Sequence, residues 1–229
     1  MEKRRIFLKA LYSTIPVMTG YLVLGVAFGL LLRTKGFGVL WALGMSGGIY
    51  AGSMQFVAID LMAGNAGLLT VALTTLAVNA RHLLYGISLV DEYKDAGAYK
   101  PYLIFALTDE TYSLVCHGCE LEGKDRHRYY FYVSLLDHIY WIAGGVLGSL
   151  AGSFLNFNTE GMDFTLSALF ITVVTEQWMS ESDHSSAIVG ALSSVICLLI
   201  FGAESFLIPS MLCIALALAA MHRRKGMEA

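Results

Sequence analysis

Charged side chains are scarce in this sequence. They make up 14% of the 229 residues, whereas hydrophobic residues make up 56% and the mean hydropathy is +0.63. A water-soluble domain carries roughly 25% charged residues. Because so few charges cannot cover the surface of a water-soluble globule, the composition excludes that class and indicates an integral membrane protein.

Three further absences exclude other classes of protein. The chain has no basic face or stripe outside its loops, so its net charge of −3 gives no sign of nucleic-acid binding. Its four cysteines all lie in or beside apolar runs and predict no disulfide framework. No Walker motif or glycine-rich phosphate loop occurs, so ATP coupling within this chain is not expected, and we expect no cofactor.

Apolar segments long enough to cross a bilayer recur along the chain. A spanning helix needs about 20 apolar residues, so the first segment is too long for a signal peptide and is taken as a retained helix. Two segments are short and one is long and broken by glycines. The sequence therefore predicts an all-α integral membrane fold, a bundle of seven to eight transmembrane helices, in a single domain over residues 1–229. The segments are 11–32, 37–63, 68–90, 101–116, 129–151, 163–178, 186–202 and 205–222.

The distribution of Lys and Arg predicts the orientation in the membrane. If all eight segments cross and the N-terminus lies inside, the inner segments, which include 64–67 and 117–128, hold ten Lys and Arg. The outer loops hold four, which are Arg33, Lys35, Lys94 and Lys100. Cytoplasmic loops carry an excess of Lys and Arg. We therefore predict a multi-pass protein of the cell membrane with both termini in the cytoplasm.

A weak internal repeat occurs at an offset of 119 residues. Tyr21, Gly25 and Gly29 fall on Tyr140, Gly144 and Gly148. Transporters are often built from such repeats, which here would be halves of about 11–116 and 129–222. The halves would be parallel with eight crossings and inverted with one fewer between them. Chance similarity between apolar helices is the alternative.

Glycines recur four residues apart and therefore line single helix faces. This spacing predicts that helices pack closely there. The adjacent Gly47 and Gly48, close to Gly52, are compatible with a second interpretation, an unwound stretch whose backbone groups face a cavity. The spaced glycines are Gly25 and Gly29, then Gly44, Gly48 and Gly52, then Gly144, Gly148 and Gly152.

Ionisable residues lie inside the apolar segments. Such side chains are costly at membrane depth, so they face a bundle interior or a water-filled path. Arg81 has apolar sequence on both sides, and Asp109 or Glu110 could neutralise it. The pair could hold a substrate or proton, or it could only brace the bundle. The candidates are Asp60, Arg81, His82, Asp109, Glu110, Asp137, His138, Glu176 and Glu204.

A zwitterionic solute suits these residues, because its carboxylate needs a cation or a helix N-terminus and its ammonium group needs carbonyls or a carboxylate. We place the solute site where the broken segment Gly47–Gln55 meets the helix at Asn79–His82. Asp109 and Glu110 are candidates for proton coupling, and His82 could carry a proton near neutral pH. The predicted substrate-binding residues are Tyr50, Gly52, Gln55, Asn79, Arg81 and His82.

Two short motifs suggest other chemistry. Gly44-Met45-Ser46-Gly47 has the form of an intramembrane serine protease nucleophile, which would need a base such as His82 or His138. Cys116-His117-Gly118-Cys119 looks like half a zinc site, but no second ligand pair follows, so interfacial thiols and no metal site are expected. A protease with Ser46 as nucleophile and a passive small-solute channel are therefore the alternatives to a transporter.

Three segments in order resemble the AzlC family, the large subunit of branched-chain amino-acid exporters. They are Tyr50-Ala51-Gly52-Ser53-Met54-Gln55-Phe56, Arg81-His82-Leu83-Leu84-Tyr85-Gly86 and Leu107-Thr108-Asp109-Glu110, and Ile15-Pro16 also fits. The resemblance covers roughly residues 10–220, with the second half matched mainly in length and hydropathy. It implies a secondary transporter, not an enzyme, that exports leucine, isoleucine, valine or similar neutral amino acids. It also implies a small AzlD-type membrane subunit as partner.

Overall fold

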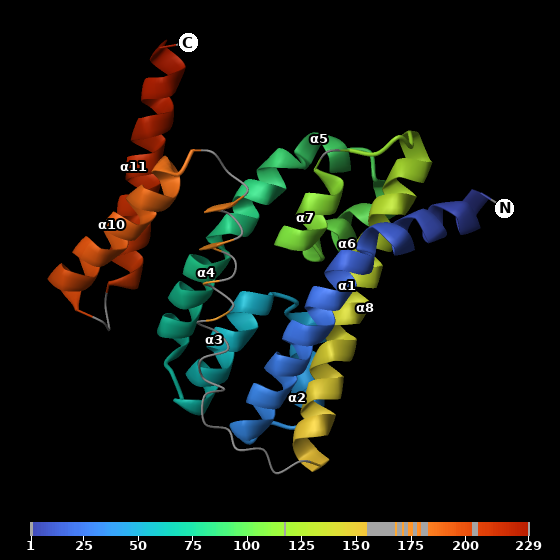
Figure 1. The fold of residues 1–229 in the computed structure, drawn as a ribbon, viewed down its shortest axis with the longest axis horizontal. Coiled ribbons are helices and arrows are strands. Elements are labelled where there is room, and N and C mark those ends of the chain that lie inside the picture. The colour runs from blue at the N-terminus through green and yellow to red at the C-terminus, as the bar shows by residue number, and fades with distance from the viewer. Residues whose placement is uncertain are drawn as a thin grey trace. The chain divides into compact units, whose positions relative to one another are not determined.

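The computed structural model describes residues 2–116, 118–154, 168, 171, 174–175, 178–179, 183–202 and 206–228. These residues form ten α-helices and one short 3-10 helix, and they contain no strand (Figure 1). The all-helical class is therefore confirmed, although the helices outnumber the seven to eight that hydropathy predicts. The chain divides into two compact units, Met1–Val71 with Val78–Asp163 and Ala72–Ala77 with Phe164–Ala229.

Two long helices, α1 (Glu2–Thr34) and α8 (Gly123–Phe154), lie side by side in the first unit (Figure 1). Near their starts the Tyr129 hydroxyl donates to Ser13 Oγ at 3.0 Å. Further along, the rings of Tyr21 and Trp141 lie 5.4 Å apart, centroid to centroid. Residue numbers rise together along both helices, so the two helices run parallel.

Glycines set the distance between α1 and α8. A Cβ on Gly29 would lie 2.1 Å from the carbonyl oxygen of Gly145, and one on Gly148 would lie 2.1 Å from that of Val26. The tight packing predicted from glycine spacing is therefore confirmed for Gly25, Gly29, Gly144 and Gly148. It is not confirmed for Gly44 and Gly48, where an added Cβ meets no described atom within 4 Å.

The segment 37–63 folds into a helical hairpin. It consists of α2 (Val39–Gly48) and α3 (Gly52–Ala63), separated by Ile49–Ala51. Lys35 Nζ, just before α2, lies 3.4 Å from Asp60 Oδ1 near the end of α3. The hairpin therefore starts and finishes at the C-terminal end of α1. The break predicted from the glycine cluster is confirmed, but residues 37–63 are not a continuous span.

Helix α4 (Leu68–Ser88) leads back to the end where α1 and α8 begin. The short helix α5 (Val90–Tyr93) follows it, and Glu92 Oε2 lies 3.2 Å from Arg126 Nη1 at the start of α8. Residues 64–67 and 91–100 therefore lie at the ends opposite to those that eight crossings predict. Three helices of the described residues are long and apolar enough to cross a membrane, at Lys3–Thr34, Leu68–Ser88 and Gly123–Phe154.

A second hairpin follows the 3-10 helix η1 (Gly97–Tyr99). It consists of α6 (Lys100–Phe105) and α7 (Asp109–Val115). The ring of Tyr102 lies 5.4 Å from Phe131, and the ring of Phe105 lies 5.8 Å from His138 further along α8. Val115, at the end of α7, returns to the cluster that holds Tyr130. The short apolar segment 101–116 is therefore two helices and not one continuous span.

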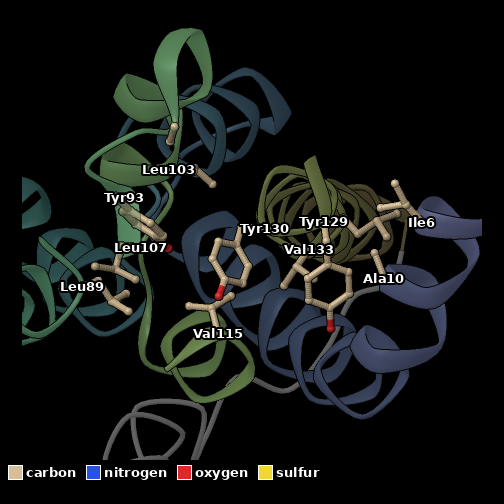
Figure 2. Close-up of a cluster of buried hydrophobic side chains, with 12 residues drawn as sticks. Ile6, Ala10, Leu89, Tyr93, Leu103, Leu107, Val115, Tyr129, Tyr130 and Val133 are labelled. Carbon is tan, nitrogen blue, oxygen red and sulfur yellow. The ribbon is translucent and has the colours of Figure 1, made fainter. Parts of the chain in front are cut away.

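Buried side chains fix this second hairpin to the first thirds of α1 and α8. Tyr130 is fully buried at the centre of the cluster (Figure 2). Every helix at this end of the unit contributes, so the cluster holds the hairpin in position. Its members are Ile6, Ala10, Leu89, Tyr93, Ala96, Leu103, Leu107, Val115, Tyr129, Tyr130, Val133 and Leu136.

The described part of the second unit contains α10 (Ser185–Phe201) and α11 (Leu207–Glu228). The sulfur of Cys197 lies 3.9 Å from that of Cys213, and neither cysteine is in a disulfide. Most of the predicted span 163–178, with Glu176 and Glu204, lies outside the described residues. If 119, the offset of the predicted repeat, is added to the first and last residue numbers of α1, the results fall within two residues of the bounds of α8. The repeat halves themselves stay a prediction.

Candidate functional site

The tip of the first hairpin is a strained three-residue break. Tyr50 has a φ of +46°, in the left-handed region that costs a non-glycine residue on the order of 1–3 kcal/mol. Its ring stacks on His138 of α8 with a centroid distance of 4.1 Å. Such strain persists only where the surrounding structure holds it, which is typical of functional sites.

The tip of the second hairpin, Ala106–Thr108, lies at the same level along α8 as the tip of the first. Thr108 caps α7 by accepting a hydrogen bond from the backbone N–H of Thr111 at 3.3 Å. His138 joins the two hairpins near their tips, because Nδ1 lies 3.0 Å from the Tyr102 hydroxyl in α6 and Nε2 lies 3.0 Å from the carbonyl oxygen of Ser46 in α2. We call residues 49–51 and 106–108 the hairpin junction. His138 lies near the middle of α8, so the junction is at mid-length of the α1–α8 pair.

A cavity of about 340 Å³ opens beside the hairpin junction. Its wall is mostly aliphatic and aromatic, with a few polar side chains from α4, α5 and α6. The Tyr93 hydroxyl has no hydrogen-bond partner among the described residues. Burial raises the pKa of Tyr93, and Glu92 raises it further, so the phenol stays a neutral donor. The lining residues are Ile49, Tyr50, Ala51, Asn79, His82, Gly86, Leu89, Val90, Tyr93, Lys100, Ile104, Phe105 and Leu107.

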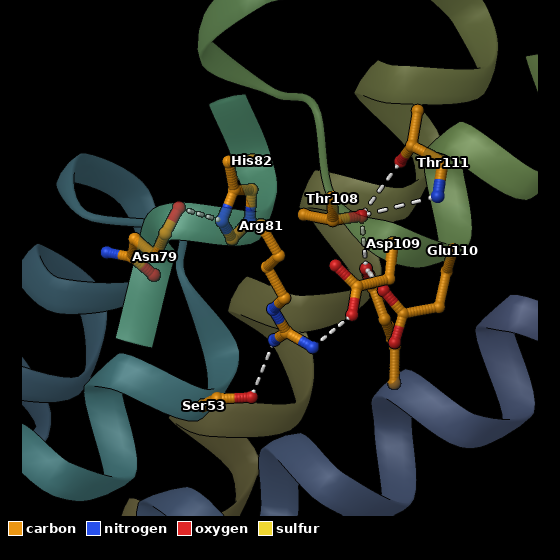
Figure 3. A network of polar contacts seen from close by, with 9 residues as sticks. Ser53, Asn79, Arg81, His82, Thr108, Asp109, Glu110 and Thr111 are labelled. Atoms are coloured by element: carbon orange, nitrogen blue, oxygen red, sulfur yellow. Dashed lines mark hydrogen bonds and ion pairs between the residues drawn. The ribbon is translucent and has the colours of Figure 1, made fainter. Parts of the chain in front are cut away.

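Arg81 precedes the cavity-lining His82 in α4 and joins three helices (Figure 3). Nη1 forms an ion pair with Asp109 Oδ2 of α7, and Nη2 donates to Ser53 Oγ of α3 at 2.8 Å. The acidic partner expected for Arg81 is therefore Asp109. Arg81 Nε and Asp109 Oδ1 are buried, and neither has a hydrogen-bond partner in the described part of the chain. The ion pair therefore retains hydrogen-bonding capacity that a ligand could use.

Gln55 lies behind the cavity and is fully buried. Its Oε1 accepts from Trp141 Nε1 at 2.9 Å and from the backbone N–H of Ala51 at 3.2 Å. These bonds hold Ala51, the last residue of the break, against α8. An added Cβ on Gly52 would lie 3.3 Å from the Trp141 ring, so Gly52 lets α3 approach α8. Both residues therefore shape the junction without lining the cavity.

Tyr50, Asn79 and His82 are the predicted substrate-binding residues that line the cavity. His82 Nδ1 also lies 3.3 Å from the carbonyl oxygen of Asn79 in the preceding turn. The binding roles of all six predicted residues stay predictions. Sequence reasoning did not assign His138 or Trp141 to the site. The only sequence signal for either residue was that His138 lies inside an apolar segment.

The geometry does not favour the protease alternative. Ser46 Oγ lies 3.5 Å from Gln55 Nε2, whereas His138 faces the backbone carbonyl of Ser46 and not its hydroxyl. A nucleophilic serine needs a base within hydrogen-bond reach of its hydroxyl. Neither Cys116 nor Cys119 is in a disulfide, and no cluster of three metal-ligating side chains occurs within the described ranges.

Long apolar helices with polar groups gathered beside a cavity at their mid-length define a helical membrane protein. The chain belongs to the AzlC family, because the AzlC protein family matches residues 16–155. This range runs from within α1 to just beyond the end of α8 and contains the hairpin junction.

Relatives from several bacteria support this assignment. The branched-chain amino acid transport protein AzlC of Bacillus subtilis (strain 168) is 42% identical over 95% of this chain and 85% of its own length. An uncharacterized membrane protein of Helicobacter pylori (strain ATCC 700392 / 26695) is 41% identical over 99% of both chains. The inner membrane protein YgaZ of Escherichia coli (strain K12) is 28% identical over 82% of this chain and 81% of its own. No solved structure matches.

Proposed function

We propose that this chain is a secondary transporter that exports branched-chain or similar neutral amino acids across the cell membrane. The observation that carries the proposal is the cavity beside the hairpin junction, where two broken helices meet. Transporters place their substrate sites at such discontinuous helices near the bilayer midplane. The name of the Bacillus subtilis relative supports the substrate class, and the family resemblance supports a small AzlD-type subunit as partner.

The lining of the cavity suits a branched aliphatic amino acid. Ile49, Leu89 and Ile104 offer an apolar wall for the side chain. Asn79 and His82 offer hydrogen-bonding groups for the amino-acid head. A volume of about 340 Å³ falls in the range of roughly 300–1,000 Å³ that is usual for small-ligand pockets.

The position of the cavity supports export. It extends from the hairpin junction to Tyr93 and Lys100, at the end of the first unit where α1 and α8 begin. Beyond the junction, buried Phe28 packs on Phe56 and Trp141 with centroid distances of 5.7 and 6.1 Å. An exporter takes up its substrate from the cytoplasm. A cavity open toward the basic end and closed by these three rings fits that step, if the basic end is cytoplasmic.

Efflux from proteoliposomes tests this proposal. Vesicles that contain the chain with its small subunit are loaded with labelled isoleucine, and efflux is followed with and without an imposed proton gradient. We expect saturable efflux that the gradient accelerates and that unlabelled leucine inhibits. A passive channel would show efflux that the imposed proton gradient does not accelerate. Absence of saturable efflux with both subunits present would overturn the assignment.

Asn79→Ala tests the position of the site. Asn79 lines the cavity, so we expect weaker efflux with little change in the melting temperature. Gln55→Ala should instead lower stability by about 1–3 kcal/mol, because it leaves buried N–H groups of Trp141 and Ala51 without an acceptor. Asn65→Gly is the control, since it removes an amide outside the cavity at a residue whose φ of +49° suits glycine. Normal efflux in Asn79→Ala would place the site elsewhere.

A further inference from the structure

An unbroken chain of hydrogen bonds joins two carboxyl groups inside the first unit. Glu110 Oε2 lies 2.7 Å from the Tyr21 hydroxyl, which lies 2.7 Å from Thr108 Oγ1. Thr108 Oγ1 lies 3.1 Å from Thr111 Oγ1, which lies 2.9 Å from Asp137 Oδ2. Thr108 and Thr111 face each other in Figure 3. The chain therefore has four links through three hydroxyl groups.

The three hydroxyl groups supply three hydrogens, but the chain has four oxygen–oxygen contacts that each need one hydrogen. Each hydroxyl donates one hydrogen bond, and an ionised carboxylate donates none. If both carboxyl groups were ionised, one pair of oxygens in the chain would face each other without a hydrogen. One added proton, on either carboxyl group, supplies the missing donor, and all four links are then satisfied.

The surroundings of the chain also favour one added proton. Tyr21, Thr108, Thr111 and Asp137 are all buried, and Asp137 is 0% exposed. Neither Glu110 nor Asp137 has an ion-pair partner in the described residues, because Arg81 is paired with Asp109. Two ionised carboxylates without a cation are costly in an apolar interior. Asp137 Oδ1 is buried and has no hydrogen-bond partner among the residues described.

We infer that Glu110 and Asp137 share one proton and that the Tyr21–Thr108–Thr111 hydroxyls relay it between them. With the proton on Glu110, every hydroxyl donates toward Asp137. When Glu110 releases it, each hydroxyl receives one proton and passes on its own, and Thr111 delivers a proton to Asp137 Oδ2. One proton has then moved, the three hydroxyls are restored, and the hydrogen bonds all point toward Glu110. Glu110 is partly exposed and Asp137 is not, so Glu110 is the end that exchanges protons with water.

Other titratable groups face the relay. They are neutral phenols or a compensated ion pair, so they supply no net charge that would keep both carboxyl groups ionised. His138, next to Asp137 in sequence, directs its ring nitrogens to Tyr102 and to the Ser46 carbonyl. The facing groups are Tyr50, Tyr85, Tyr102, Asp109 and Arg81.

Infrared spectroscopy of the purified full-length chain tests the shared proton without any transport assay. We expect the C=O band of a protonated carboxyl group at neutral pH. It should disappear in Asp137→Asn and also in Glu110→Gln, because either amide N–H can supply the missing donor. Asp125→Asn, at an acid paired with Arg128, is the control and should keep the band. A wild-type protein without the band, or a band that survives both substitutions, would overturn the inference.

The relay itself is tested by a matched pair of variants. Thr111→Val removes the hydroxyl that contacts Asp137 and keeps the side-chain shape, whereas Thr111→Ser keeps the hydroxyl. In proteoliposomes we expect Thr111→Val to lose proton-driven efflux by an order of magnitude or more and to keep substrate exchange, which needs no net proton transfer. Thr111→Ser should retain both. Equal proton-driven efflux in the two variants would contradict the relay.

This coupling role rests on the proposed transport function, whereas the shared proton does not. If the wild-type protein moves no amino acid but shows the carboxyl band with the expected losses, the proposed function fails and the shared proton stands. If it transports amino acids but shows no such band, the transport function stands and the shared proton fails.

Discussion

At the scale of single residues, the Arg81–Asp109 ion pair offers a test that separates binding from bracing. About a third of each side chain is exposed. Removing one partner of a buried pair costs about 3–5 kcal/mol, and this exposure favours the lower part of that range. Arg81→Met with Asp109→Leu should restore stability, since neither charge is left alone. If Arg81 holds the substrate carboxylate during part of the cycle, we expect the double variant to melt near the wild-type temperature and yet to transport no amino acid.

A second ion pair provides the control. Arg126 and Glu92 are 3.2 Å apart and similarly exposed, but they lie at the start of α8, away from the hairpin junction. Arg126→Met with Glu92→Gln removes that pair and keeps an acceptor for the Tyr130 hydroxyl. This variant should retain efflux. A stable and fully active Arg81–Asp109 double variant would show that the pair only braces the helices.

The sequence narrowed the partner of Arg81 to Asp109 or Glu110, because a lone cation in an apolar span needs an anion and few are near it; the structure shows Asp109. The chain of hydrogen bonds between Glu110 and Asp137 could not be predicted from the sequence. Tyr21 and Glu110 are 89 residues apart, and Thr111 and Asp137 are 26 apart. Their contacts depend on how α1, α7 and α8 are rotated about their axes, and hydropathy carries no information on that rotation.

At the scale of elements, the two helix breaks differ in how well the sequence predicts them. The first follows a glycine pair, and glycine marks possible breaks in apolar segments. The second, Ala106–Thr108, contains neither glycine nor proline, and the hydropathy of 101–116 averages over both short helices. Whether the chain reverses at a break is decided by tertiary contacts. For the first hairpin the Lys35–Asp60 ion pair shows the reversal, and no local sequence pattern does.

The closeness of α1 and α8 leads to a prediction on Gly29. A Cβ at this position would lie 2.1 Å from the Gly145 carbonyl oxygen, so the helices would have to move apart. Overpacking of this kind typically costs 1–3 kcal/mol. Gly29→Ala should therefore lower the melting temperature of the purified chain. Gly20→Ala in the same helix meets no described atom within 4 Å and should leave it unchanged or raise it, because alanine favours helix. Equal melting temperatures for the two variants would contradict this packing.

At the scale of the molecule, the two hairpins change which basic residues lie at each end of the first unit, compared with eight crossings. Because 91–100 lies beside the start of α8, Lys94 and Lys100 join the basic cluster at that end of the first unit. Only Arg33 and Lys35 remain at the other end in the part of this unit that the structure describes. The contrast between the two ends is therefore sharper than the ten-to-four count from eight crossings. The residues at the basic end are Lys3, Arg4, Arg5, Lys9, Lys94, Lys100, Lys124, Arg126 and Arg128.

Single cysteines in a background without the four native ones test this arrangement in intact cells. Lys and Arg favour the cytoplasmic side, so the basic end should face inward. We expect an impermeant thiol reagent to label Ala63→Cys at the end of α3 from outside. Lys3→Cys, Ala98→Cys and a C-terminal cysteine should react only after permeabilisation. Eight continuous crossings predict the reverse for positions 63 and 98, so these two exposed residues, read together with the N-terminal cysteine, decide between the two topologies. Labelling of Ala98→Cys and not of Ala63→Cys in intact cells would mean that the hairpins are crossings or that the whole molecule is inverted. The N-terminal cysteine separates these two outcomes, because only inversion exposes it.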